Sequence, residues 1–268
     1  MGETGTLFNN LKLSEFLKFY FLGWLIVFSA GREEVFAQET YKFDLDFLFI
    51  PCVEIVMEIS DTTDVRGQQL KKLDYYTRTR PLFNPIFQVN NTYKTVYHPE
   101  TFQVVFTENK IEQSNLFQNI SAEYSDNIVK YSNGSIRSIL PGAHNIFSLL
   151  MHLRMMDCKQ LDRERILVEL AGNLYEAQLS YGGEEIVTVD KDGVVADKIE
   201  ISLFLLTTGR STVTEKTDIF HQRIGSPDSR KFIWIERAAP RRIVKAEFNL
   251  PPVWLVATLS ADKDEVYP

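Results

Sequence analysis

Histidines are the first side chains of this sequence to consider for metal binding or acid–base chemistry. His98, His144, His152 and His221 lack the i, i+4 spacing and the adjacent glutamate of a helical zinc site. His144 and His152 could approach each other across two helical turns, but a polar rim or a solvated position is favoured over a ligand pair. The sequence therefore predicts no metal ion.

The common signatures of nucleophilic and nucleotide-dependent enzymes are absent. The chain has no G-x-S-x-G, no G-x-x-x-x-G-K and no G-x-G-x-x-G. Residues 260–263 match S-x-x-K, but a polar C-terminal tail offers no walls to desolvate the lysine. Glu184 and Glu185 are neighbours on an extended segment, which directs them to opposite faces. We expect no catalytic residue and no cofactor.

The two cysteines are too few for a disulfide scaffold or for a zinc site with four ligands. Cys52 and Cys158 could pair in an oxidising compartment and join the first hairpin to the end of a helix. A bond requires a Cα separation under about 7 Å, which sequence alone does not establish. Whether the two cysteines form a disulfide stays an open question at this point.

Composition excludes two broad classes of protein. The 268 residues are 44% hydrophobic, which is enough to build a core and argues against a disordered chain. The formal net charge of -7 and the pI of about 5.3 lack the basic surface needed to bind a phosphate backbone. Nucleic acid is not an expected partner.

The N-terminal segment has the layout of a signal peptide. Lys12 and Lys18 precede an apolar run at 19–30, which is shorter than the roughly 20 residues of a membrane-spanning helix. Val-Phe-Ala at 35–37 suits a cleavage site, so we expect a signal peptide at 1–37, a mature chain from Gln38 and no stable transmembrane anchor. The predicted location is the bacterial periplasm. A buried N-terminal helix is the alternative.

Alternating apolar residues and regularly spaced turns predict an antiparallel β protein. Residues 41–49 place five apolar side chains on one face of a strand, and Pro51 is expected to end that strand. Turn signals such as Asn133-Gly134 then recur every ten to fifteen residues, as in a sandwich, roll or open barrel. We expect one β-rich domain at 38–260 and a polar tail at 261–268.

One segment follows a helical period instead. Between Asn145 and Asp157 apolar residues recur at spacings of three and four, and they cover more than one side of the helix. Such a helix must be buried, most simply in the concave face of a curved sheet. We expect Leu150 to be buried there, and Arg154 to extend its guanidinium to the rim.

Strands in the last third of the chain are apolar on both faces, at 199–206, 232–235 and 253–257. One face must meet the core. The other needs a cover, which could be the helix, a second layer, a partner protein or a bound acyl chain. We favour packing within the protein itself as the cover of this second face.

Three segments together resemble a bacterial family of unknown function, DUF3108. They are Ser-Leu-Leu-Met-His-Leu-Arg at 148–154, Glu-Ile-Val-Thr-Val at 185–189 before Asp-Gly, and Ile-Trp-Ile at 233–235 followed by Arg-Arg-Ile-Val at 241–244. The resemblance implies an exported cell-envelope protein of antiparallel β structure, similar to the curved sheets with which lipoprotein and lipid carriers wrap a helix. It implies no reaction. The motif positions Arg154, Trp234, Arg241 and Arg242 are the candidate ligand-binding residues.

The leading hypothesis is a mainly β, exported, non-catalytic envelope protein. Its curved antiparallel sheet, an open barrel or roll with one apolar helix in its concave face, would bind an amphiphile or a partner protein in its hollow. The first alternative is an envelope hydrolase whose site is assembled from residues distant in sequence. The second is a purely structural assembly subunit.

Overall fold

A computed structural model describes residues 38–47, 49–125, 127–161, 164–206, 213, 214, 216, 218–250 and 253–260. The chain separates into two compact units, Met1–Ala37 and Gln38–Pro268, and the second unit is described here. The predicted signal peptide, its cleavage site and the tail at 261–268 lie outside the described residues.

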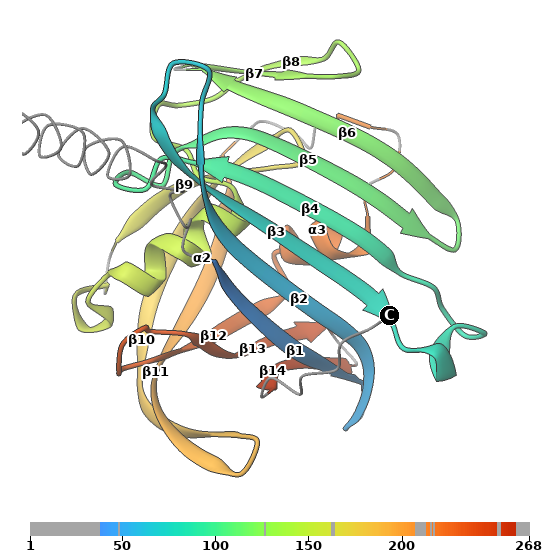
Figure 1. The fold of residues 1–268 in the computed structure, drawn as a ribbon, viewed down its shortest axis with the longest axis vertical. Helices are drawn as coiled ribbons and strands as arrows, with labels where there is room; N and C mark the ends of the chain where they lie inside the picture. Colours follow the sequence, from blue (N-terminus) through green and yellow to red (C-terminus); the bar gives the residue numbers. More distant parts are fainter. Residues whose placement is uncertain are drawn as a thin grey trace, which may run out of the picture. The chain divides into compact units, whose positions relative to one another are not determined.

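The described residues form one antiparallel sheet of fourteen strands that curves around two helices (Figure 1). The predicted mainly β fold is confirmed. Its order is β8-β7-β6-β5-β4-β3-β2-β1-β14-β13-β12-β11-β10-β9, so β1 pairs with the last of the described strands. The strands are β1 (Glu39–Phe47), β2 (Ile50–Thr63), β3 (Gln69–Thr79), β4 (Asn90–Tyr97), β5 (Val104–Gln113), β6 (Leu116–Ser125), β7 (Ile128–Tyr131), β8 (Ile136–Ser138), β9 (Arg165–Leu170), β10 (Asn173–Val189), β11 (Asp192–Leu205), β12 (Arg230–Glu236), β13 (Ile243–Leu250) and β14 (Val253–Ser260).

The predicted alternation holds along β1, except at its end. Tyr41 and Phe43 are buried, but Phe49 is 97% exposed because it lies in the turn after β1 with a positive φ of 67°. Pro51 does not end the strand as expected. It belongs to β2 and pairs with Asp46 beside a register irregularity, a place where a residue without an N–H is tolerated.

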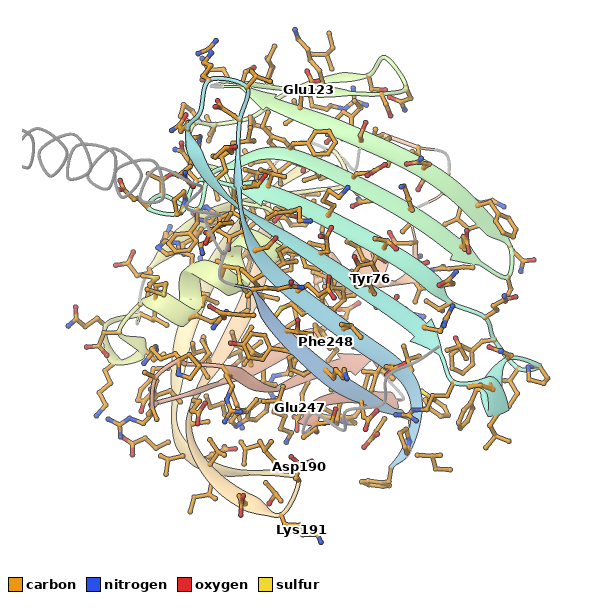
Figure 2. The ribbon with its side chains drawn as sticks, viewed as in Figure 1. Tyr76, Glu123, Asp190, Lys191, Glu247 and Phe248 are labelled. Carbon is orange, nitrogen blue, oxygen red and sulfur yellow. The ribbon has the colours of Figure 1, made fainter. Side chains whose placement is uncertain are left out.

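The predicted hairpin turn at Asn133-Gly134 is confirmed. Gly134 lies in the turn between β7 and β8, with a φ of 85° that glycine adopts without strain. The longest hairpin joins β10 to β11, and Figure 2 shows its tip, at Asp190 and Lys191, projecting away from the other strands.

The two ends of the sheet are joined by side chains rather than by a strand ladder. Tyr124 of β6 and Tyr131 of β7 each donate a hydrogen bond to the carboxylate of Glu169 on β9, at 2.6 and 2.7 Å. The backbone of His144 bonds to the other edge of β9, through Leu167 O and Glu169 N. Because that edge is already paired, β9 cannot extend the ladder to β8, and the sheet stays open.

Two α-helices lie within the curve of the sheet, where the sequence predicts one (Figure 1). α2 (Ile146–Met155) is the predicted helix, and Asn145 caps it in a reciprocal capping box with Ser148. α3 (Ile219–Ile224) was not predicted, because six residues are too short for a recognisable helical period. Short 3-10 turns occur at Pro81–Phe83 and Cys158–Gln160. No helix in the described part of the chain has both the length and the apolar composition to cross a bilayer.

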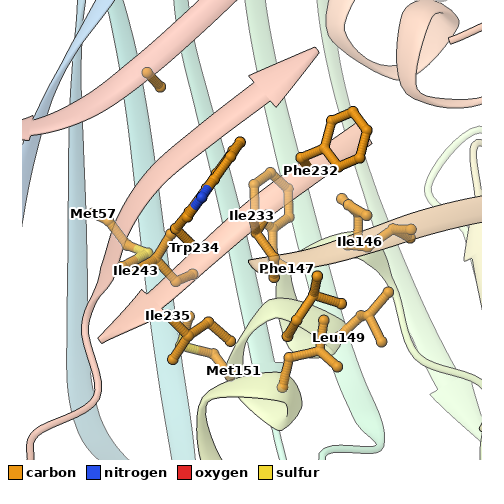
Figure 3. Packing of buried hydrophobic residues seen from close by; sticks show 14 of the residues in the cluster. Met57, Ile146, Phe147, Leu149, Met151, Phe232, Ile233, Trp234, Ile235 and Ile243 are labelled. Atoms are coloured by element: carbon orange, nitrogen blue, oxygen red, sulfur yellow. The ribbon is translucent and has the colours of Figure 1, made fainter. Parts of the chain in front are cut away.

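Helix α2 is buried in the core, as predicted. Leu149 and Leu153 are fully buried, and Figure 3 shows Leu149 and Met151 facing the strand residues Ile233 and Ile235. The expectation for Leu150 is wrong in degree. Its side chain is only partly buried, because it lines an open cavity instead of packed atoms.

The doubly apolar strand β12 is covered on its second face by long cationic side chains. Trp234 is 1% exposed, and the Nζ atoms of Lys198 and Lys245 lie 4.9 and 4.4 Å from the centroid of its ring. Both lysines come from the neighbouring strands, directly opposite Trp234 in register. The cover is therefore part of the sheet itself, stabilised by cation–π contacts.

Candidate functional site

An apolar cavity of about 430 Å³ lies between the concave face of the sheet and the two helices. Its volume falls in the range of roughly 300–1,000 Å³ that is typical of small-molecule sites. Inward-facing residues of β1, β2, β3, β4, β11, β12, β13 and β14 form the wall, and α2 and α3 contribute Leu150 and Phe220. The alternation of the strands produces this lining, since it directs every second side chain inward.

Aromatic rings close the inner end of the cavity. Phe147 of α2 lies 5.1 Å from Tyr75, 5.4 Å from Tyr93 and 5.7 Å from Phe220, measured between ring centroids. Tyr93 and Phe147 are almost completely buried. Apolar packing therefore forms a rigid floor at this end.

The opposite end opens to solvent. Phe47, Ile86 and Ile219 line the cavity and are also 39%, 77% and 55% exposed. We call these three residues and Arg223 of α3, which is also exposed and lines the cavity, the mouth. Phe49 and Leu82 add further exposed apolar surface in the neighbouring turns.

Two cations line the cavity, and neither has a carboxylate partner among the described residues. Lys231 of β12 is 3% exposed, and its Nζ donates hydrogen bonds to the backbone oxygens of Ser229 at 2.6 Å and Ser226 at 3.4 Å. Burial lowers the pKa of Lys231 to about 8. The guanidinium of Arg223 takes part in none of the hydrogen bonds or ion pairs of the described part of the chain.

A histidine–aspartate pair lies at the start of α3. Asp218 caps the helix, accepts a bond from His221 Nδ1 at 2.5 Å, and accepts another from the hydroxyl of Tyr93 at 3.0 Å. Burial alone would raise the pKa of Asp218, but the charge and hydrogen bonds of His221 lower it on balance. For His221, burial opposes protonation, yet Asp218 raises the pKa. The pair therefore fastens α3 to β4.

His221 of this pair borders a second hollow of about 630 Å³ with a more polar lining, which includes Gln113, Ser114 and Asn173. An aspartate–histidine pair can serve as a general base in hydrolysis. Within the described residues, however, the His221 side chain bonds only to Asp218, and no serine or cysteine bonds to it. The arrangement supplies a base without a bound nucleophile.

His144 and His152 do approach each other. Their rings are nearly parallel, with His152 Nδ1 3.1 Å from His144 Nε2, and His144 Nδ1 lies 3.0 Å from Gly142 O. His144 is buried, so the favoured solvated position is wrong for it. No cluster of three or more potential ligands occurs among the described residues that could hold a metal ion.

The structure places Arg154 and Arg241 at the end of α2, and neither of them lines the apolar cavity. Arg154 is 7% exposed, so its expected position at the rim is wrong, and its guanidinium bonds to Glu39 at 2.8 Å and Tyr41 at 3.1 Å. Each of the two arginines also donates to the backbone oxygen of the other. Arg241 bonds in addition to Met156 O at 2.9 Å, and so satisfies carbonyls left free at the helix end.

Arg242 and Trp234 also have partners within the protein. Arg242 forms a two-point ion pair with Glu236, at 2.7 and 3.1 Å. Trp234 donates its indole N–H to Glu185 at 2.7 Å and is not among the cavity residues. Trp234 thus links β12 to β10, Arg242 pairs with the end of β12, and the two other arginines join α2 to β1 and to the segment after β12.

Cys52 and Cys158 are not brought together as a disulfide. Both thiols are buried and free; that of Cys52 donates to Leu45 O, and that of Cys158 accepts from Arg241 at 3.2 Å. Burial raises the pKa of both thiols.

Sequence reasoning missed Lys231, Arg223 and Asp218. For Lys231 a signal exists, because it shares the inward face of β12 with Ile233 and Ile235 by simple alternation. Arg223 and Asp218 belong to the helix that the sequence did not reveal.

Fold and cavity together define a barrel-like open sheet with an apolar interior. A scan against protein-family models found no match, and a search of the curated proteins found no relative. Among solved structures, the chain is similar to a β-barrel-like protein of the domain of unknown function DUF1849 from Brucella abortus. The TM-score is 0.50 and the identity 14%, over 83% of this chain and 94% of that chain. This likeness shows the fold, and the DUF3108 resemblance stays a prediction.

Proposed function

We propose that this protein is an exported, non-catalytic protein of the bacterial cell envelope that binds an amphiphile in the hollow of its sheet. The cavity carries the proposal. It is enclosed by apolar and aromatic side chains, it opens at one end, and exposed apolar residues surround that opening. Burial of an acyl chain there would be favourable by about 0.8 kcal/mol for each CH₂ group.

Binding can be tested with N-phenyl-1-naphthylamine, a neutral probe whose fluorescence rises in apolar surroundings. Ala246 lines the cavity, so Ala246→Phe should fill part of it and weaken probe binding about tenfold or more. Val195→Phe, at an exposed position of the β10–β11 hairpin, is the matched control and should bind like the wild type. Equal binding by a folded Ala246→Phe protein would exclude the cavity as the site.

The natural occupant and the export can be tested on protein from its own envelope. Native mass spectrometry should show a bound species in the range of a single amphiphile. N-terminal sequencing should begin at Gln38, where the boundary between the two compact units of the chain also falls. Recovery of Met1 in a soluble cytoplasmic pool would contradict export.

A hydrolase is the second candidate, favoured by the Asp218–His221 pair, whose histidine lines the polar hollow. We expect background rates with ester, phosphate, glycoside and peptide substrates. An activity that His221→Gln abolishes in a protein with unchanged Tm would establish the hydrolase and displace the binding proposal.

A further inference from the structure

The charged residues that line the apolar cavity are all of one sign. Arg223 and Lys231 are the cations, and none of the described lining residues is an aspartate or a glutamate. An apolar chain alone would not require them, since a cation gains no attraction from an apolar ligand.

Lys231 is the more unusual of the two. Its ammonium has three N–H donors, and the backbone oxygens of Ser226 and Ser229 account for two of them. The hydroxyl of Ser229 is itself buried without a hydrogen-bond partner among the described atoms. A buried ammonium without a counter-ion is costly unless an anion joins it.

The register of the sheet places Lys231 at the open end of the cavity. Lys231 pairs with Phe248, Phe248 with Leu255, and Leu255 with Phe47, so these four residues form one row across β12, β13, β14 and β1. Phe47 belongs to the mouth. An amphiphile whose chain passes inward from the mouth would therefore leave its head group at the level of this row, where Lys231 lies.

We propose that the occupant is an anionic amphiphile whose carboxylate or phosphate head binds Lys231 and Arg223, with its chain directed toward α2. This assignment rests on the proposed function and adds the chemical class of the ligand. The free donor of Lys231 forms a charge-assisted hydrogen bond with the head group, and Arg223 closes over it from the solvent side.

The test compares ligands of one chain length: tetradecanoic acid, tetradecyl phosphate and tetradecan-1-ol, each displacing N-phenyl-1-naphthylamine from the purified protein. The variants are Lys231→Met, which keeps the aliphatic stem, and Arg223→Gln. Arg230→Gln is the matched control, because Arg230 precedes Lys231 but is exposed. The relative affinities of the acid and the phosphate identify the head group.

The wild type and Arg230→Gln should bind one or both anions at least about tenfold more tightly than the alcohol. Lys231→Met should lose most of this preference while its affinity for the alcohol is unchanged, and Arg223→Gln should lose part of it. Without ligand, Lys231→Met loses the hydrogen bonds to Ser226 O and Ser229 O but also the cost of a buried charge, so its Tm should stay close to that of the wild type. A lower Tm with an unchanged preference would assign Lys231 a structural role only and overturn the proposal.

Failure of the two proposals can be told apart. If none of the three ligands binds, the proposed function itself is wrong. If the alcohol binds as tightly as both anions in the wild type, the cavity binds amphiphiles but the head-group assignment is overturned.

Discussion

Acidification should destabilise the protein through His144, and the size of the effect follows from its surroundings. His144 Nδ1 lies 3.0 Å from a carbonyl oxygen, so it carries the proton, and Nε2 accepts from His152. Burial, and then the charge of His152, lower the pKa of His144 from 6.5 to about 4, although the Gly142 carbonyl acts in the opposite direction. The folded state therefore holds this ring neutral.

The direction in which stability changes with pH follows from proton linkage. The stability due to a neutral His144 is fully present above the unfolded pKa of 6.5, and it is lost as the pH falls toward the folded pKa of about 4. The difference of about 2.5 pKa units corresponds to roughly 3 kcal/mol at full protonation, and about 2 kcal/mol of this should be lost by about pH 5.

Urea unfolding of the wild type and of His144→Asn, from about pH 8 to about pH 4.5, measures the effect. Asparagine can keep the donor to Gly142 O but does not titrate, so the variant should be less stable by about 1 kcal/mol at neutral pH. Its deficit should shrink and then reverse as the pH falls. His98→Asn, at a hairpin turn, is the matched control for a histidine lost elsewhere. A wild-type minus variant difference that stays constant over this range would refute the reasoning.

Three further predictions concern the helices. Leu149→Ala should cost about 2–5 kcal/mol in urea unfolding, whereas Met155→Ala, at a position that is 73% exposed, should cost well under 1 kcal/mol. Arg241→Ala leaves two carbonyls at the end of α2 unpaired and should lower the unfolding free energy by roughly 2 kcal/mol or more, while an unchanged Tm would show that the cap is unimportant. Asp218→Asn should lower the free energy of unfolding by an amount on the order of 3 kcal/mol. This loss should be largest between pH 3.8 and pH 6.5, the ordinary pKa values of an aspartate and a histidine. The lowered pKa of Asp218 makes its contribution fade at lower pH and the raised pKa of His221 makes it fade at higher pH, so a deficit that peaks outside this window would contradict the coupling.

Local features of the sequence determined the secondary structure. Alternation along β1 and β4, the turn at Asn133-Gly134 and the helical period after Asn145 are set by neighbours a few residues apart. Such signals survive in any tertiary context, so the β-rich fold with an inner helix could be predicted. The helix α3 could not be predicted in this way, because its six residues span fewer than two helical turns.

The site depended on contacts between residues far apart in the chain. Arg154 and Arg241 are 87 positions apart, and Tyr93 and Asp218 are 125 apart, yet each pair shares a hydrogen bond. The sequence could not reveal these hydrogen bonds of the motif positions, because a single sequence does not show which charges will find partners inside the protein.

For Lys231, the sequence determined one property and the tertiary structure another. Alternation directs it inward, which the sequence determined, but its position at the open end follows only from the register of β12 with β13, β14 and β1. Register and curvature result from the summed packing of a whole sheet, where no short segment dominates, so only the tertiary structure could place this buried cation in an apolar cavity.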